Sequence, residues 1–381
     1  MDNEQPLTLL CLAHLNWDHV WQRPQQLMTR FARRCRVIFV DPPGRGKSGE
    51  EPHFEERQGH GGVRVVRPIF PAEVIQEAGD QYEAMWSRLL PELLAEAGPN
   101  TILWVFSPRA DYLVRQAEPH VRVAVYDCMD DLASFRGAEV DLHRREANLL
   151  EDVALVTTGG FSMYQLRKDR HPNVHCFPSG VDVAHYRQVQ DPATTVPVSV
   201  SALTHPRLGY FGVLDERIDW SMIGAIAARR PEWQWVMVGP FAKVEASELP
   251  SAPNIHYLGP QAYTDLPRFL KGFDIATMPF ALNEATRFIS PTKTLEYLAG
   301  GKPVVSSSVP DVVAFYQGIV HIVDGADGWI ETIEQVLASS EAERAARRER
   351  ATVLLDQSSW DSIAERMWAL MMEAMAGKAA V

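Results

Sequence analysis

Short apolar segments that alternate with amphipathic helical segments constrain the fold of this chain more than any other feature of its sequence. The first half begins with an apolar segment at Leu7–Ala13, a helical pattern at Arg23–Arg34 and a second apolar segment at Arg36–Asp41. Strands expected at Arg207–Gly212 and Trp235–Val238 start the same alternation again in the second half. Such alternation is typical of parallel sheets covered by helices. The sequence therefore predicts an α/β fold of two Rossmann-like, doubly wound domains.

A proline-containing segment separates the two series. Residues 191–206 contain three prolines and no sustained hydrophobic period, which predicts a linker. We therefore expect an N-terminal domain over residues 1–196, a C-terminal domain over residues 205–358 and a last helical segment over residues 359–381. Doubly wound sheets bind ligands at the carboxyl ends of their strands, so the functional residues are expected in the loops that follow strands.

Composition excludes several classes of protein. The chain has 46% hydrophobic and 23% charged residues, as globular proteins do, and its net charge of -12 argues against sequence-independent binding to nucleic acid. Its four cysteines lack C-x-x-C spacing, which predicts neither a zinc site nor a disulfide framework. We see no signal-peptide pattern and no run of about 18 apolar residues. These features predict a cytoplasmic protein, with any membrane contact peripheral.

One segment of the second half carries the strongest functional pattern. Pro291 suits the first turn of a helix and Ser290 an N-cap, so the pattern predicts a helix from Pro291 to Ala299. The amino end of a helix attracts anions, and Lys293 in the first turn adds positive charge there. Glu296 lies on roughly the same face, where its carboxylate can accept hydrogen bonds from two ribose hydroxyls. The alternative is a solvated ion pair between Lys293 and Glu296.

Residues 290–305 read SPTKTLEYLAGGKPVV. This segment resembles the donor-binding half of GT-B glycosyltransferases, in a bacterial polysaccharide-type branch of families 1 and 4 that reads SPTK-x-x-EY-x-A-x-G-x-PVV. The resemblance implies that the lysine contacts a diphosphate, that the glutamate contacts a ribose, and that the last helix crosses back to the N-terminal domain. The donor-binding residues that we expect are Arg217, Gly239, Tyr263, Ser290, Pro291, Thr292, Lys293, Thr294 and Glu296.

Arg217 follows a glycine-containing turn after the first strand of the second domain. In the family that the chain resembles, a basic residue at this place meets the donor phosphates. A guanidinium suits a carboxylate as well as a phosphate, so the alternative is a surface arginine paired with Asp215 or Asp219.

The chain departs from the family at one position. Retaining members often carry a glutamate eight positions before the ribose-binding one, but Phe288 stands there in this chain. Glu284 is the nearest acid upstream and comes four residues too early. The resemblance therefore leaves the stereochemistry open.

The loop after the first expected strand is rich in groups that can bind sugars. Trp17 and Trp21 can stack on a sugar or an aglycone, while His14 and Asn16 can hydrogen-bond. The pattern W-D-x-V-W-Q-R-P-Q, which includes Arg23, resembles a bacterial polysaccharide-type subgroup of the same transferases. That resemblance implies acceptor binding by Asn16, Trp17, Trp21 and Arg23. The alternative is a loop whose tryptophans cover the hydrophobic core.

A cluster of aspartates follows a later strand of the same domain. Asp127, Asp130 and Asp131 lie in the sequence VYDCMDDL. An inverting transferase needs a base that removes the proton of the acceptor hydroxyl, and Asp130 is the first candidate, with Asp131 and His14 as the others. The alternative for these aspartates is a helix N-cap after the strand.

Five arginines gather on or beside the first expected helix, at positions 23, 30, 33, 34 and 36. They form either a solvated face or a contact with anionic lipid, which would suit a lipid-linked acceptor.

Together these patterns predict a metal-independent hexosyltransferase. It would move a sugar from a nucleoside diphosphate, with UDP as the expected carrier, to a hydroxyl of a saccharide, glycolipid or other small acceptor. The nucleotide-sugar is a co-substrate, and we expect no cofactor, no metal and no nucleic-acid partner. The alternatives are a nucleotide-sugar epimerase of the same fold and a nucleotide-binding relative that has lost catalysis. The sugar, the acceptor and the oligomeric state stay open.

Overall fold

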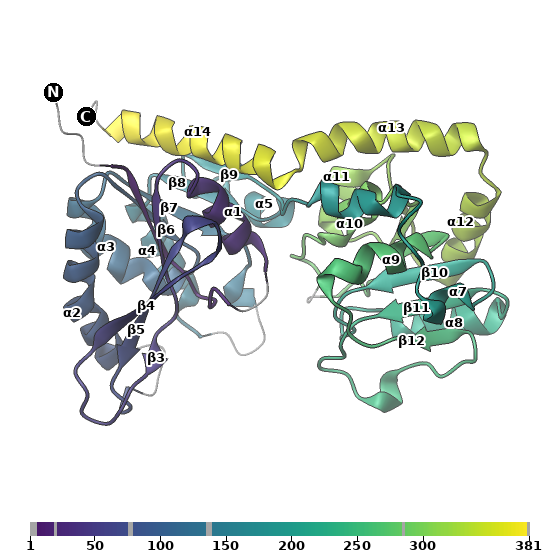
Figure 1. The fold of residues 1–381 in the computed structure, drawn as a ribbon, viewed down its shortest axis with the longest axis horizontal. Coiled ribbons are helices and arrows are strands. Elements are labelled where there is room, and N and C mark those ends of the chain that lie inside the picture. Colours follow the sequence, from purple (N-terminus) through teal and green to yellow (C-terminus); the bar gives the residue numbers. More distant parts are fainter. Residues whose placement is uncertain (1–5, 19–20, 75–78, 135–138, 284–285, 379–381) are drawn as a thin grey trace. The chain divides into compact units, whose positions relative to one another are not determined.

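The computed structural model describes residues 6–18, 21–74, 79–134, 139–283 and 286–378. The chain forms two compact units (Figure 1). The first comprises Met1–Pro178 together with Trp360–Val381, and the second comprises Ser179–Ser359.

A sheet of nine strands, β1 to β9, forms the centre of the first unit. Eight of them follow the order β3-β5-β2-β1-β6-β7-β8-β9, and β4 pairs antiparallel with β5. The strands are β1 Thr8–Leu12, β2 Arg36–Val40, β3 Gly44–Arg45, β4 His53–Gln58, β5 Arg64–Phe70, β6 Thr101–Val105, β7 Val123–Cys128, β8 Leu155–Thr158 and β9 Val174–Cys176. Its α-helices are α1 Arg23–Phe31, α2 Asp80–Ala97, α3 Asp111–Ala117, α4 Leu142–Asp152, α5 Phe161–Arg167 and α14 Trp360–Lys378.

The parallel strands of this sheet are buried on both faces. All residues of β1 and β6 are buried, which explains why they form nearly continuous apolar runs. Neighbouring residues of β1 belong to different cores. Leu9 packs in a core with Phe31 of α1 and Met367 of α14, whereas Leu10 packs in a core with Leu89 of α2.

The last helix, α14, belongs to the first unit although it follows the second unit in the chain. It lies beside α1 in Figure 1. Its buried residues recur at helical spacing, so one apolar stripe faces the core. They are Trp360, Ile363, Ala364, Met367 and Met371.

All five arginines of the basic cluster are in ion pairs. On α1, Arg30 pairs with Asp361 at 3.1 Å. Arg33 pairs with Asp361 at 2.8 Å, and Arg34 pairs with Glu365 of α14. The remaining two pair elsewhere in the unit, Arg36 with Glu96 and Arg23 with Asp127. Two acids of α14 therefore pair with three arginines on or just after α1, and nothing in this arrangement supports the membrane contact suggested by the sequence.

The second unit is a parallel sheet of six strands in the order β12-β11-β10-β13-β14-β15. The strands are β10 Arg207–Phe211, β11 Gln234–Val238, β12 Ile255–Tyr257, β13 Ile275–Met278, β14 Val304–Ser306 and β15 His321–Ile322. The α-helices are α6 Val183–Arg187, α7 Val198–Ser201, α8 Trp220–Arg229, α9 Leu266–Lys271, α10 Lys293–Ala299, α11 Pro310–Tyr316, α12 Ala326–Ala338 and α13 Glu341–Gln357.

Both sheets reverse their strand order at one point. Counted along the chain from β10, the second sheet has the Rossmann order 3-2-1-4-5-6, with β10 and β13 on either side of the reversal. In the first sheet the order reverses between β1 and β6. The α/β prediction is thus confirmed, and the carboxyl ends of these four strands are the places where such sheets bind ligands.

The boundary between the units lies between Pro178 and Ser179, earlier in the chain than the linker composition indicates. Tyr186 and Val189 are buried in the core of the second unit. The segment expected to be a linker contains α7, whose Val200 is fully buried. Within the described residues, no helix combines the length and the apolar character needed to cross a membrane.

Candidate functional site

Two glycines mark the carboxyl ends of β10 and β11. Gly212 has a φ of 146° and Gly239 a φ of 148°, values that other residues rarely adopt. The two backbones touch, because a Cβ atom added to Gly239 would overlap the carbonyl oxygen of Gly212. The end of β10 is therefore a stretch of bare backbone at the point where the strand order reverses.

Lys293 lies over this bare backbone. A Cβ atom at Gly212 would stand 2.7 Å from the Cε atom of Lys293. The buried hydroxyl of Tyr297, on the next turn of α10, accepts a hydrogen bond from the backbone N–H of Phe211 at 3.0 Å. This bond holds α10 against the end of β10. Among the residues that the structure describes, the ammonium of Lys293 has no hydrogen bond and no ion pair, so the sequence alternative of a Lys293–Glu296 pair is not formed.

The helix itself begins later than the sequence indicates. Lys293 is its first residue and Thr292 its N-cap, without a side-chain capping bond. Ser290 and Pro291 therefore belong to the loop before α10, and the expected N-cap at Ser290 is wrong. Thr294 is fully buried, and its hydroxyl lies 3.4 Å from the sulfur of Met278. Thr294 therefore packs α10 on the sheet, and its side chain does not face a ligand.

Aromatic residues surround Glu296. Burial, followed by the charge of Glu296, raises the pKa of Tyr186. Tyr263 is 50% exposed, and its ring stacks on that of His185 with centroids 4.1 Å apart. Burial and then the charges of Asp182 and Glu296 raise the pKa of Tyr263. The carboxylate of Glu296 thus lies near an accessible aromatic plane.

Arg217 takes the alternative arrangement predicted for it. Its Nε and Nη2 groups donate hydrogen bonds to the carboxylate of Asp215, at 3.0 Å and 2.6 Å. Burial by itself lowers the pKa of Arg217, but the hydrogen bonds to Asp215 and its negative charge outweigh burial, so the pKa of Arg217 is raised. Position 288 offers no carboxylate because it is a phenylalanine. The ring of Phe288 lies under the guanidinium of Arg287, with the Cζ atom 5.1 Å from the ring centroid. Glu284 lies outside the described residues.

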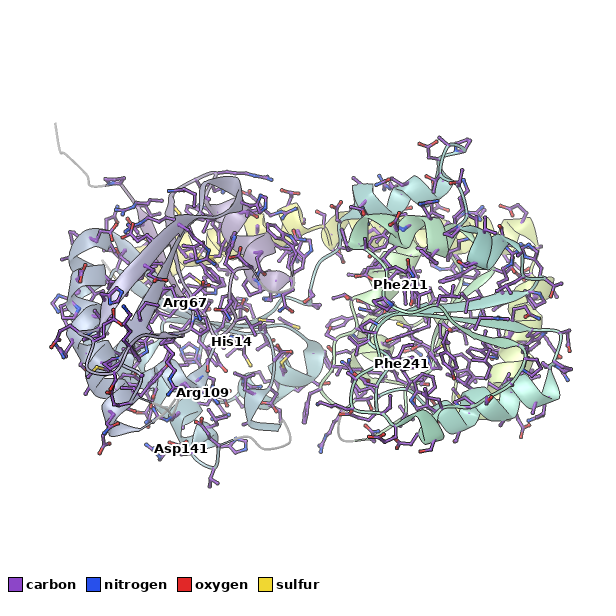
Figure 2. The ribbon with its side chains drawn as sticks, turned by 60° about the horizontal axis from the view of Figure 1, so that its bottom comes forward. His14, Arg67, Arg109, Asp141, Phe211 and Phe241 are labelled. Carbon is purple, nitrogen blue, oxygen red and sulfur yellow. The ribbon has the colours of Figure 1, made fainter. Side chains whose placement is uncertain are left out.

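In the first unit, His14 follows β1 at the corresponding reversal (Figure 2). Burial, followed by the positive charge of Arg109, lowers the pKa of His14 to about 4. Its Nδ1 atom is buried and has no hydrogen-bond partner within the described part of the chain. The imidazole is therefore neutral at neutral pH and retains a nitrogen for a ligand.

The structure separates the expected acceptor residues. Trp17 is buried, and its ring packs edge-on against Phe39 at 4.9 Å between centroids. Arg23 is also buried, and it donates to Asp127 at 2.7 Å and 2.8 Å. Trp17 therefore covers the core, which is the alternative given for the tryptophans, and Arg23 is held in a buried ion pair. Asn16 is exposed, and Trp21 is 46% exposed.

The three aspartates after β7 also differ from one another. Asp127 holds Arg23 and accepts a hydrogen bond from Thr157 at 2.7 Å. Asp131 is buried and paired with Arg167 at 2.8 Å, so a structural role accounts for this aspartate without a catalytic one. Asp130 is half-buried. No group of three or more metal-ligating side chains occurs in the described ranges.

Sequence reasoning did not find a cavity of about 460 Å³ in the first unit. It is lined by Asn16, Asp18, Asp41, Glu55, Glu56, Arg57 and Arg67. The sequence did contain a signal for it. Glu55 and Arg57 are two positions apart, so they share one face of a strand, and Asp41 directly follows an apolar strand. The cross-strand pairing of β4 with β5 was needed to bring them together.

The chain has two doubly wound units, as GT-B glycosyltransferases do, and its solved structural neighbours are of that fold class. The solved structures agree over nearly the whole chain. A trehalose-6-phosphate structure from E. coli with UDP-2-fluoro glucose matches at a TM-score of 0.69 and 11% identity, over 96% of this chain and 99% of that one. Anabaena Alr3699/HepE in complex with UDP and glucose matches at 0.66 and 13%, over 96% and 99%. Such identities show the fold.

Sequence comparisons add to the likeness in fold. Residues 205–339 match the family model described as Glycosyl transferases group 1. TuaH of Bacillus subtilis, a glycosyltransferase assigned to teichuronic acid biosynthesis, is 34% identical over 106 residues. That match spans 27% of this chain and 27% of the relative. By fold over nearly its whole length, and by sequence over residues 205–339, the chain is similar to GT-B glycosyltransferases.

Replacing Gly239 tests the contact between the two glycines. We expect Gly239→Ala to lower the free energy of unfolding by clearly more than the ~1 kcal/mol typical of single substitutions, because the new methyl group overlaps a backbone carbonyl. Gly325→Ala is the matched control, since Gly325 has a φ of 72° but open space around it. Denaturant unfolding measures both. Equal losses in the two variants would contradict the contact.

The low pKa of His14 predicts a dependence of stability on pH. Between about pH 6.5 and pH 4 the unfolded chain binds a proton at His14 that the folded chain does not, so stability falls as the pH falls, by at most about 1.4 kcal/mol per pH unit. His14→Gln should reduce this slope, whereas substitution of the exposed His120 should not. An unchanged slope in His14→Gln, measured by unfolding across this range, would contradict the burial of a neutral imidazole.

Proposed function

We propose that this protein is a glycosyltransferase that binds a nucleoside-diphosphate sugar on its second unit and transfers the sugar to a hydroxyl of a saccharide acceptor. The observation that carries the proposal is the ammonium of Lys293, without a counter-ion among the described residues, over the bare backbone of Gly212 and Gly239. A diphosphate would supply the missing charge. The match of residues 205–339 to a glycosyltransferase family model supports the same reading.

Lys293 would stabilise the charge that develops on the leaving diphosphate. In the transfer, the acceptor oxygen forms a bond to the anomeric carbon while the bond from that carbon to the diphosphate oxygen breaks. The electron pair of that bond stays on the diphosphate, so a fixed cation lowers the barrier. Gly212 and Gly239 have no side chain that would keep the phosphate oxygens away from the backbone.

The nucleoside would bind beside the diphosphate. In this proposal Glu296, one turn after Lys293, accepts hydrogen bonds from ribose hydroxyls, and the half-exposed ring of Tyr263 provides a plane on which a base can stack. UDP is the carrier that we propose. Two of the similar solved structures contain UDP or a UDP-sugar, although their low identity means that they support only the choice of probe.

His14 is the base that we propose for the acceptor hydroxyl. A base must be unprotonated before it removes a proton, and His14 meets this condition at neutral pH with an unpartnered Nδ1 atom. A pKa of about 4 makes it a weak base in the free protein. Asp130 is the second candidate, and Asp131 is less suitable because Arg167 holds it.

Variants at both nucleotide contacts test the donor site. We expect Lys293→Ala to weaken binding of UDP and of pyrophosphate by about tenfold to a hundredfold, the range for a lost hydrogen bond to a charged group. Glu296→Ala should weaken binding of UDP and uridine but leave pyrophosphate binding unchanged. Calorimetry measures all three ligands.

Arg229→Ala is the matched control, because it removes an exposed cation on α8 of the same unit. It should leave all three affinities unchanged. Failure of the intact protein to bind any nucleoside diphosphate would refute the proposal, as would UDP binding that Lys293→Ala leaves intact.

A transfer assay tests the base. His14→Gln should lower the rate of acceptor-dependent UDP release by roughly 10²–10⁴-fold and leave UDP binding unchanged, because general bases contribute in that range. Asp130→Asn is the comparison. If Asp130→Asn abolishes transfer while His14→Gln retains it, the base is Asp130 and the assignment to His14 is wrong.

A further inference from the structure

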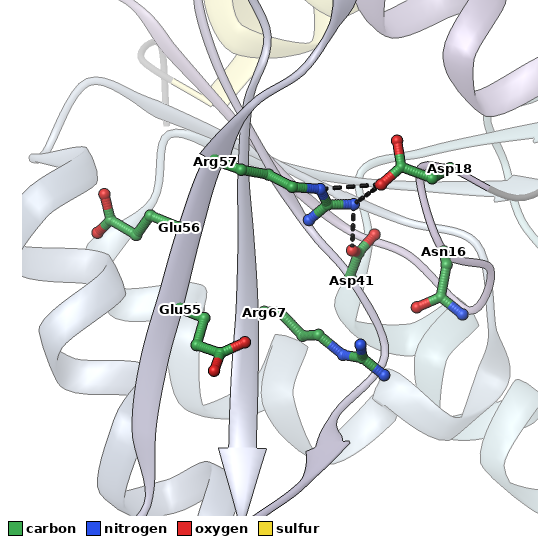
Figure 3. Close-up of a pocket in the computed structure, with 7 residues that line it drawn as sticks. All are labelled: Asn16, Asp18, Asp41, Glu55, Glu56, Arg57 and Arg67. Carbon is green, nitrogen blue, oxygen red and sulfur yellow. Dashed lines mark hydrogen bonds and ion pairs between the residues drawn. The ribbon is translucent and has the colours of Figure 1, made fainter.

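The cavity of the first unit lies at the carboxyl ends of β1 and β2, where sheets of this kind bind ligands. Asn16 and Asp18 come from the loop after β1, and Asp41 directly follows β2. The opposite wall is the antiparallel pair β4 and β5, which carries Glu55, Glu56, Arg57 and Arg67 (Figure 3). A volume of about 460 Å³ is within the range of small-molecule sites, roughly 300–1,000 Å³.

One side of the cavity is fixed by a network of hydrogen bonds. Arg57 donates to Asp18 at 2.7 Å and to Asp41 at 2.9 Å (Figure 3). The other oxygen of Asp41 accepts a hydrogen bond from the backbone N–H of Trp17 at 2.7 Å. Asp41 is buried, so this network joins the β1 loop, the end of β2 and β4 into a fixed wall.

Arg67 has no partner in this wall. Its Nε atom is buried without a hydrogen-bond acceptor, and among the described residues its guanidinium forms no ion pair. Glu55 stands directly across the β4–β5 ladder from Arg67, and both side chains line the cavity, but the two do not pair. A guanidinium that lines a cavity without a counter-ion can be neutralised there by a bound oxyanion.

The remaining charges narrow the class of ligand. Four carboxylates line the cavity, but Asp18 and Asp41 are held by Arg57, and Glu56 pairs with Arg64. This leaves the fork of Arg67, which suits a carboxylate or a phosphate, and the carboxylate of Glu55, which can accept hydrogen bonds from sugar hydroxyls.

We propose that this cavity binds a saccharide that carries an oxyanion, with Arg67 on the carboxylate or phosphate and Glu55 on hydroxyl groups. The proposal rests on the proposed function, since it makes the cavity the acceptor subsite of the glycosyltransferase. The space for the guanidinium depends on Gly44, because a Cβ atom there would lie 2.8 Å from the Nε atom of Arg67.

Calorimetry on the full chain without any donor tests this proposal. The probes are glucuronic acid, glucose 6-phosphate, glucose and glucosamine. We expect glucuronic acid or glucose 6-phosphate to bind at least about tenfold more tightly than glucose, and this preference to fall as the salt concentration rises. Comparing glucuronic acid with glucose 6-phosphate shows whether the cavity prefers a carboxylate or a phosphate. Arg67→Ala should remove the preference, and Arg67→Lys should restore part of it.

The control is Arg88→Ala, which removes an exposed arginine of α2 that does not line the cavity. It should leave the preference intact. The denaturant unfolding transition of Arg67→Ala should match that of the unaltered chain, which shows that the variant is folded, and its UDP binding should be unchanged. Equal binding of charged and neutral sugars, tighter binding of glucosamine, or a preference that survives Arg67→Ala would overturn the proposal. If UDP does not bind but the preference for the oxyanion disappears in Arg67→Ala, only the proposed function fails.

Discussion

The central parallel strands of both sheets bury apolar side chains on both faces, and this constraint determines where the protein can place polar chemistry. β1 and β6 are wholly buried, as are nearly all residues of β10 and β11. Polar side chains that must meet a ligand are therefore confined to the loops at the ends of the strands. His14 and Asp41 follow strands of the first unit, and Lys293 reaches the end of β10 from α10.

Arginine pairing decides which of the polar residues are available. Arg23 and Arg167 are buried and form ion pairs with Asp127 and Asp131. Arg57 forms ion pairs with Asp18 and Asp41. The Arg23–Asp127 and Arg167–Asp131 pairs are costly to break, because both partners are buried and removal of one leaves a buried charge uncompensated. The cationic groups that remain without a partner among the described residues of the two sites are Lys293 and Arg67. Their lack of a counter-ion is what makes each of them a candidate for binding an anion.

The sequence predicted the features that depend on short stretches of chain, namely the positions of strands and the spacing of residues along one helix. The strands at Leu7–Ala13 and Trp235–Val238 were found to within a residue at each end, because apolar runs bounded by polar residues are a short-range signal. The relation of Lys293 to Glu296 follows from helix spacing alone. Long-range pairing was beyond reach. Arg23 meets Asp127 across 104 positions of the chain, so the sequence could not show that this arginine is withdrawn from the surface. The cavity depended on the pairing of β4 with β5 for the same reason.

A crystal structure of the protein with a bound UDP-sugar tests the central claim most directly. The account predicts diphosphate oxygens within hydrogen-bonding distance of the Nζ atom of Lys293, over Gly212, with the ribose hydroxyls on the carboxylate of Glu296. A diphosphate bound elsewhere, for example on Arg67 in the cavity of the first unit, would contradict it.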